Sequence, residues 1–330
     1  MGSRWVAAGA AAAAASILGA TPVAAHGVVA GPPDAGMLLT GWSFDIEVWL
    51  PVLLAAWGYL VLVRSVDRAH PTTPVPRRRL WYWMGGLGVL LVATQSVIGA
   101  YDTTLFTTHM VQHLLLTMVA APLLLLGAPV TLLLRAASPD VRKDVILPVL
   151  HSRVVRALSH PIVAWGQFAV VMWASHFTGL FDAALEDPLV HALEHALYLG
   201  SALLFWWPVV GVDPAPRRLP HPMRVGYLVV GMPFSSFLGL AIFSATHVLY
   251  QHYATLRRDW GQPPLEDQQW AGGIMWAGGD LLFLVAVLFA IRAWLRAEEA
   301  EARRIDSVLE RDRIRGPAEA TGPATRGEEA

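Results

Sequence analysis

The chain has 330 residues, of which 55% are hydrophobic and only 15% are charged, and its formal net charge is −1. Soluble proteins carry charge on about a quarter of their residues, so this composition indicates an integral membrane protein. No segment is basic enough to indicate nucleic-acid binding. The absence of cysteine excludes disulfides, thiolate metal sites and iron–sulfur clusters. A metal ion would have to bind His, Met, Asp, Glu or backbone groups.

The first 25 residues have the pattern of a secretory signal peptide. Arg4 supplies a positive charge, an alanine-rich apolar run follows, and the small residues around Ala25 suit cleavage there. Cleavage would make His26 the new N-terminus, with a free amine beside its imidazole. An uncleaved anchor helix is the alternative. Residues 26–43 are then expected to form a periplasmic segment.

Seven further apolar stretches follow, each about twenty residues long, which is the length that crosses a bilayer as a helix. The expected spans are 44–63, 80–100, 107–134, 161–180, 189–210, 225–249 and 269–292. The fold class predicted is therefore all-α: a polytopic membrane helix bundle of seven transmembrane helices within residues 44–296, after the signal peptide. The charged segment 297–330 is predicted to be a cytoplasmic tail, partly disordered, whose first part extends the last helix.

Basic residues are concentrated in alternate links between these spans. The link after the first span contains five arginines, and those after the third and fifth are also basic, whereas "YDTTLF" has no basic residue and "FDAALEDP" has only acids. The link before the last span is the exception, with two arginines that face three acids. Because basic links favour the cytoplasmic side, the N-terminus is predicted to lie outside and the C-terminus inside.

Histidines gather at the predicted outer ends of the spans. Two pairs have i,i+4 spacing, which places both imidazoles of a pair on one helix face. Two further histidines lie at the outer ends of the fourth and sixth spans. Six histidines from four helices are therefore expected at one depth and are the predicted metal ligands: His109, His113, His176, His191, His195 and His247.

Further side chains could bind a metal directly or orient the imidazoles. Six carboxylates are candidates, of which all but the last are expected near the level of the histidines, whereas the last lies deeper in the final span: Asp45, Glu47, Asp102, Glu194, Asp267 and Asp280. The thioether of Met172 and the imidazole of His26 are the other candidates. Neutral imidazole is a good ligand for copper and zinc, and thioether sulfur favours Cu(I), so copper is the predicted cofactor. The methionines Met110, Met118, Met232 and Met275 are interpreted as packing residues, and the glycines of "GGIMWAGGD" are expected to allow close helix approach.

Other chemistry could use the same histidines. Haem b could be ligated axially by His113 and His195, which would make the protein a membrane electron carrier. Haem needs only two of the six histidines, so a bare metal is favoured. A di-iron hydroxylase would have richer histidine boxes, and no adjacent His–His pair occurs. A copper importer would use the same site as a protein that delivers copper.

Three strings occur in order: "HMVQHLLLTMVAAPLLLLGAP", "WASHFTGLFDAALEDPLVHALEHALYLGSALLFWWPVVG" and "DQQWAGGIMWAGGD". With them, residues 42–295 resemble the seven-span CtaG-like family of cytochrome c oxidase assembly factors, the polytopic kind. The histidines of the two pairs, His176 and the segment from Asp267 to Asp280 match family motif positions, and His26 lies outside the matched region.

This resemblance implies a protein of the bacterial plasma membrane that binds copper and helps deliver it to a respiratory terminal oxidase, a role that needs no catalysis. The partners it implies are subunits of cytochrome c oxidase, periplasmic copper donors and the lipid bilayer, and they include no nucleic acid. The roles of individual ligands are predictions from the residues.

Overall fold

The computed structural model describes residues 31–33, 36–37, 41–215 and 217–315, and all regular structure in this part of the chain is helical. Six helices are long and apolar enough to cross a membrane, and a seventh span results if one bent pair of helices is counted together. The protein is therefore a multi-pass membrane helix bundle, as the composition and the apolar runs predict. The predicted signal peptide and His26 lie outside the described residues, as do residues 316–330.

The first three spans occupy the N-terminal half of the chain. Their helices are α3 (Ile46–Ala69), α4 (Arg77–Gln95), α5 (Val97–Tyr101), α6 (Phe106–Leu114), the π-helical η1 (Leu115–Ala120), α7 (Ala121–Leu126) and α8 (Pro129–Ala136). Short helices then lead to the fourth span: α9 (Pro139–Val141), the π-helical η2 (Arg142–Ile146), α10 (Leu147–Leu150) and α11 (Arg153–Leu158).

The remaining spans follow in the C-terminal half. Their helices are α12 (Pro161–Phe177), α13 (Leu180–Glu186), α14 (Pro188–Val210), α15 (His221–Phe243), α16 (Gln251–Thr255), α17 (Pro264–Gly273), the π-helical η3 (Ile274–Gly278) and α18 (Gly279–Arg315). The bent pair is α12 and α13, which meet at an angle of 70°. The fourth span thus consists of α12, after which the chain turns sharply into α13.

Three spans differ from the expected ranges by five residues or more. The first continues to Ala69 rather than ending at residue 63. The sixth ends at Phe243 rather than at residue 249. The Gln268 side chain accepts a hydrogen bond from Leu249 N at 2.7 Å and donates one to the His247 carbonyl at 3.1 Å, and this holds residues 247–249 as a non-helical link against α17. The last span begins earlier, at Pro264, and its helix continues through η3 and α18 into the segment expected as a charged tail.

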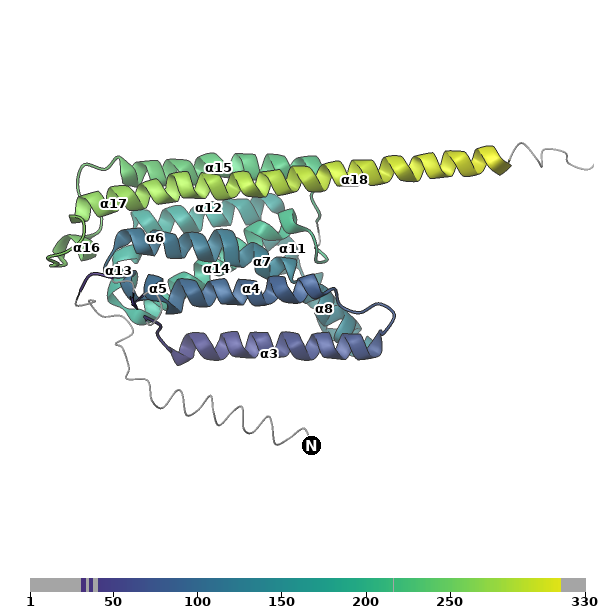
Figure 1. Ribbon diagram of the computed structural model, residues 1–330, viewed down its shortest axis with the longest axis horizontal. Coiled ribbons are helices and arrows are strands. Elements are labelled where there is room, and N and C mark those ends of the chain that lie inside the picture. Colours follow the sequence, from purple (N-terminus) through teal and green to yellow (C-terminus); the bar gives the residue numbers. More distant parts are fainter. Residues whose placement is uncertain (1–30, 34–35, 38–40, 216, 316–330) are drawn as a thin grey trace, which may run out of the picture.

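The links between the spans lie at two opposite ends of the bundle (Figure 1). The links from α3 to α4, from α8 to α12 and from α14 to α15 lie at one end, and the second half of α18 projects beyond it. The short helices α13 and α16 lie at the other end, together with the beginnings of α6 and α17. Helices that enter or leave the bundle at this second end can therefore bring their terminal residues together.

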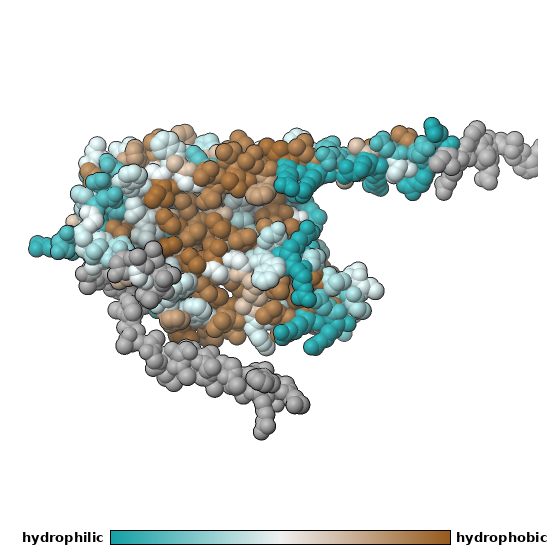
Figure 2. All heavy atoms as spheres, in the orientation of Figure 1, coloured by the Kyte–Doolittle hydropathy of each residue, from teal (hydrophilic) through white to brown (hydrophobic). Residues whose placement is uncertain are grey.

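On the face shown in Figure 2, apolar side chains form a belt across the middle of the bundle. Large side chains such as Trp57, Ile162, Phe237 and Phe289 are exposed on the spans. In water this exposure would be unfavourable, but lipid chains solvate apolar groups, so the belt marks the part of the molecule that faces the bilayer core. Hydrophilic residues cover both ends of the bundle and the projecting part of α18.

Two glycines allow α15 and α17 to approach each other closely. A Cβ atom added to Gly239 would lie 2.6 Å from Trp276 N, and one added to Gly272 would lie 2.5 Å from Phe243 N. Backbone atoms cannot move aside as a flexible side chain can. The expectation that the glycines of this segment permit close helix contact is therefore confirmed at Gly272.

Candidate metal centre

Histidines from three helices meet at the end of the bundle that carries α13 and α16. α6 and α14 begin at this end and α12 finishes there (Figure 1). Each i,i+4 pair lies in the first two turns of its helix and faces inward, because the pairs are largely buried. The histidines brought together in this way are His109 and His113 on α6, His176 on α12, and His191 and His195 on α14.

Carboxylates fix where α6 and α14 begin. Asp267 of α17 accepts hydrogen bonds from Phe106 N at 2.8 Å and from Thr107 N at 3.2 Å. It also forms an ion pair with Arg258 at 3.4 Å. Asp187 accepts from the first amides of α14. A carboxylate satisfies the free amides of a helix start and interacts favourably with the helix dipole. The sequence interpretation placed Asp267 near a metal, but its side chain caps a helix.

One group of potential ligands consists of His109, His113 and Glu194, and it is called the Glu194 set below. Their ligand atoms lie within 4.8 Å of one another, and all three side chains are buried. His109 Nε2 lies 3.8 Å from Glu194 Oε2. Neither the four ring nitrogens of the two histidines nor the two carboxylate oxygens have a hydrogen-bond partner. Each such buried group costs about 1–3 kcal/mol unless something satisfies it.

A second group, the Asp102 set, consists of Asp102, His191 and His195. Its ligand atoms also lie within 4.8 Å of one another, and His191 Nε2 lies 3.7 Å from Asp102 Oδ2. Asp102 lies in the short link between α5 and α6, outside the spanning helices. Burial raises the pKa of its carboxyl to about 7. A cation beside this carboxylate would offset the cost of burying its charge.

Gln112 connects the members of the Asp102 set, and the sequence interpretation did not include it. Its side-chain amide donates to Asp102 Oδ2 at 2.8 Å and to the Ala93 carbonyl at 3.0 Å. With both donor hydrogens used, its oxygen must accept from His195 Nε2 at 2.9 Å. His195 is then protonated at Nε2, and in the neutral ring the lone pair lies on Nδ1. The only sign in the sequence was an amide inside an apolar run, between the two histidines of α6.

Any metal bound at the Asp102 set is expected to bind about 10–100-fold more weakly when Gln112 is replaced with leucine, the usual effect of losing a group that orients a ligand. Gln167→Leu is the matched control, since the Gln167 amide also donates two hydrogen bonds, to the Ala164 and Ser201 carbonyls, but Gln167 lies on α12, outside both sets. Competition with a chromophoric chelator measures both affinities. Equal affinities in the two variants would contradict the role given to Gln112.

His176 lies at the edge of the Glu194 set. Its Nδ1 donates to the Met172 carbonyl at 2.7 Å, so the lone pair lies on Nε2, which is buried without a hydrogen-bond partner. The ring centroids of His176 and His113 are 6.0 Å apart. Met172, a predicted thioether ligand, contributes its backbone carbonyl here. His176 Nε2 is thus a further nitrogen that could bind a metal beside the Glu194 set.

Several predicted residues lie outside the two sets. His247 is exposed in the link after α15 and is not helical, because Gln268 holds that link. Asp45 and Gln95 hydrogen-bond each other at 3.0 Å, which joins α3 to the end of α4. Glu47 is exposed on α3. The sequence placed these residues at the same membrane depth as the clustered histidines, but in the structure their side chains lie outside both ligand sets.

Asp280 also has a local partner. Both of its oxygens accept from the Ser236 hydroxyl of α15, at 2.8 and 2.9 Å. An ionisable group deep in a span therefore has a hydrogen bond that connects α15 to α18.

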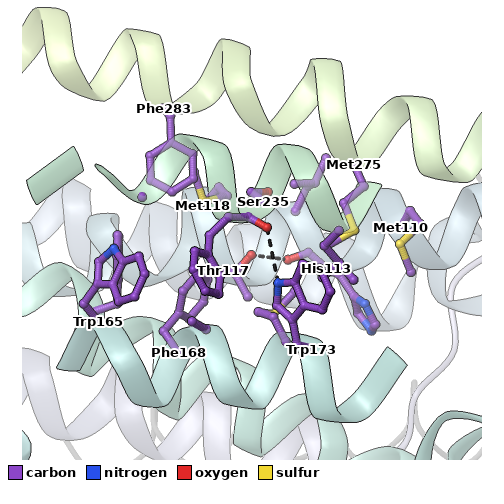
Figure 3. A pocket seen from close by; sticks show the side chains of 17 residues that line it. Met110, His113, Thr117, Met118, Trp165, Phe168, Trp173, Ser235, Met275 and Phe283 are labelled. Carbon is purple, nitrogen blue, oxygen red and sulfur yellow. Dashed lines mark hydrogen bonds between the residues drawn. The ribbon is translucent and has the colours of Figure 1, made fainter. Parts of the chain in front are cut away.

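A cavity among α6, α12, α15 and α18 adjoins the histidines (Figure 3). His113 forms part of its wall, while most of the wall is aromatic or aliphatic. The sulfur-containing residues that line it are Met110, Met118, Met172 and Met275. All four are buried in the apolar core, which agrees with the interpretation of Met110, Met118 and Met275 as packing residues, although they also border the cavity.

Comparison with known proteins places these features in a family context. A family model described as "Cytochrome c oxidase caa3 assembly factor (Caa3_CtaG)" matches residues 57–297. Uncharacterized proteins of Mycobacterium bovis and Mycobacterium tuberculosis are each 32% identical to this chain over 288 residues, and one of Mycobacterium leprae is 31% identical over 283 residues.

The matches to the first two relatives cover 85% of this chain but only 43% of each relative, and the match to the third covers 83% and 42%. The chain therefore spans less than half the length of these relatives. No solved structure matches the chain significantly.

Proposed function

The chain belongs to the Caa3_CtaG family of cytochrome c oxidase caa3 assembly factors, and from this premise we propose that it binds copper in the histidine–carboxylate cluster of α6 and α14 and helps deliver it to a terminal oxidase. Binding and transfer need no catalysis. The site would face the outside of the bacterial plasma membrane, with the N-terminus outside and the C-terminus in the cytoplasm. Periplasmic copper donors and oxidase subunits would be its partners.

The observation that carries this proposal is the burial of ligand groups without partners. His109, His113 and Glu194 leave six side-chain nitrogen and oxygen atoms without hydrogen bonds in the protein interior. A chain that gained nothing from these residues would be more stable with apolar ones. A metal ion would accept the lone pair of one nitrogen from each ring and would balance the carboxylate charge, so it accounts for the Glu194 carboxylate and for one nitrogen of each histidine.

The donor atoms influence which metal would be bound. Imidazole nitrogen suits copper, zinc and iron, while carboxylate oxygen favours divalent ions over Cu(I). Sequence reasoning expected a preference for Cu(I) from Met172, but both sets consist of two imidazoles and one carboxylate. Cu(II) is therefore the form proposed for capture, and the family's role in oxidase assembly favours copper over the other metals. Release would occur by ligand exchange with a protein partner.

Haem is less well supported by the same residues. Axial ligation by His113 and His195 would require a porphyrin-sized space that both rings border. The cavity beside the cluster is lined by His113 but not by His195. A copper importer remains the closest alternative to the assembly role, because it could use the same cluster; an uptake assay separates the two.

The proposal is tested by metal analysis and an absorption spectrum of the full chain, purified in detergent from copper-supplemented cells. We expect bound copper and no Soret band. In a deletion strain we expect the oxidase to contain less copper while total cell copper is unchanged. A Soret band, or a protein free of copper after supplementation, would rule the proposal out.

A further inference from the structure

We infer that the cluster holds two metal ions, one in the Glu194 set and one in the Asp102 set. This inference rests on the proposed copper binding and adds the number of ions and the ligands of each. It is carried by the separation of the ligand atoms, the distribution of the two carboxylates and the helices from which the ligands come.

Each set is compact enough to surround one ion. Nitrogen and oxygen ligands lie about 2.0–2.2 Å from a metal such as zinc, so two ligands of one ion are at most about 4.4 Å apart. The ligand atoms within each set lie within 4.8 Å of one another, so small side-chain movements suffice for binding. In the described part of the chain, no larger group of His, Asp or Glu ligands meets the same limit.

The rings of the two sets are farther apart than the rings within each set. The centroids of His109 and His113 are 4.1 Å apart, and those of His191 and His195 are 4.3 Å apart. Between the sets, His109 and His191 are 5.5 Å apart, and His113 and His195 are 6.3 Å apart. Two neighbouring ions fit this arrangement better than one ion shared by all four rings.

The charges favour the same arrangement. Asp102 and Glu194 are both buried. Among the described residues neither carboxylate forms an ion pair with Arg or Lys, and the ion-pair partner of each is a histidine. Arg258 is already paired with Asp267. Two ionised carboxylates in one buried cluster repel each other, and a positive charge beside each one stabilises the ionised form. One divalent ion beside each carboxylate supplies that charge.

The two ions would have different surroundings. The Asp102 set is held by Gln112, which binds both Asp102 and His195. The Glu194 set has no such amide, but His176 lies beside it and His113 borders the mainly apolar cavity. One ion would therefore be held by ligands that Gln112 orients, and the other would lie beside the His176 ring and the cavity.

The test is the number of copper ions per protein. The full chain is purified in detergent, stripped with a chelator, loaded with Cu(II) and desalted before metal analysis. We expect two ions in the unchanged protein, one in Glu194→Gln and one in Asp102→Asn, because each change removes the carboxylate charge of one set. The double variant is expected to bind none. His247→Ala, outside both sets, is expected to keep two.

Electron paramagnetic resonance on the unchanged protein provides a measurement that does not depend on variants. Two neighbouring Cu(II) ions give a dipolar-broadened spectrum, and removal of either carboxylate leaves the spectrum of an isolated ion. One copper with an isolated-ion spectrum in the unchanged protein would overturn the two-ion inference and leave the proposed function standing. No bound copper at all would overturn the proposed function itself.

Discussion

The double variant His109→Ala/His195→Ala is expected to lose all copper that survives purification and desalting. His109 belongs to the Glu194 set and His195 to the Asp102 set, so each set loses one of its three ligands. Loss of a direct ligand weakens binding by more than the about 10–100-fold typical of an orienting group. Metal analysis of the purified protein measures the effect, and the copper content of the oxidase in cells that carry the variant should fall with it.

The matched control removes two histidines that are exposed. His151 lies at the end of α10 and His247 in the link after α15. The variant His151→Ala/His247→Ala is expected to keep the copper content of the unchanged protein. If the first double variant binds as much copper as this control, then the histidines of α6 and α14 are not the ligands.

Gly272→Ala is expected to cause a large loss of stability for the addition of a single methyl group. Its Cβ would lie 2.5 Å from Phe243 N and 2.8 Å from Gly239 O, so α15 and α17 would have to separate. Overpacking of this kind costs about 1–3 kcal/mol or more when backbone atoms are involved. Thermal unfolding in detergent, followed by tryptophan fluorescence, should therefore show a clearly lowered midpoint.

The adjacent residue supplies the control for this prediction. A Cβ on Gly273 would make its nearest contact at 3.7 Å, an ordinary distance to the Phe243 ring. Gly273→Ala also removes a glycine from a helix, which favours folding by up to about 1 kcal/mol. We expect an unchanged or raised midpoint. Similar midpoints for the two variants would show that the contact between α15 and α17 does not limit stability.

The membrane fold could be predicted because its main signal is local. Runs of apolar residues of the right length give spans, and the bundle has helices at all seven of the predicted places. Two features could not be predicted. Gln268 holds residues 247–249 out of α15 from a position nineteen residues away, and the 70° bend between α12 and α13 is a tertiary arrangement.

The candidate site could be predicted only in part, for a similar reason. Helical spacing shows that His109 and His113 share a face, but not which neighbouring helix that face meets. The structure gives this, and it adds Gln112 as the residue that joins Asp102 to His195. Asp267 was predicted near the level of the histidines, but a shared level does not show what a side chain contacts. Its carboxylate caps the start of α6.

Copper K-edge X-ray absorption of the purified, copper-loaded protein tests the central claim most directly, since it reports the atoms bound to the ion. We predict a first shell of nitrogen and oxygen with the outer-shell scattering of imidazole rings, and the loss of this pattern in His109→Ala/His195→Ala. A first shell dominated by sulfur, or an imidazole pattern that persists in that variant, would contradict a copper site built from the histidines and carboxylates of α6, α14 and the link before α6.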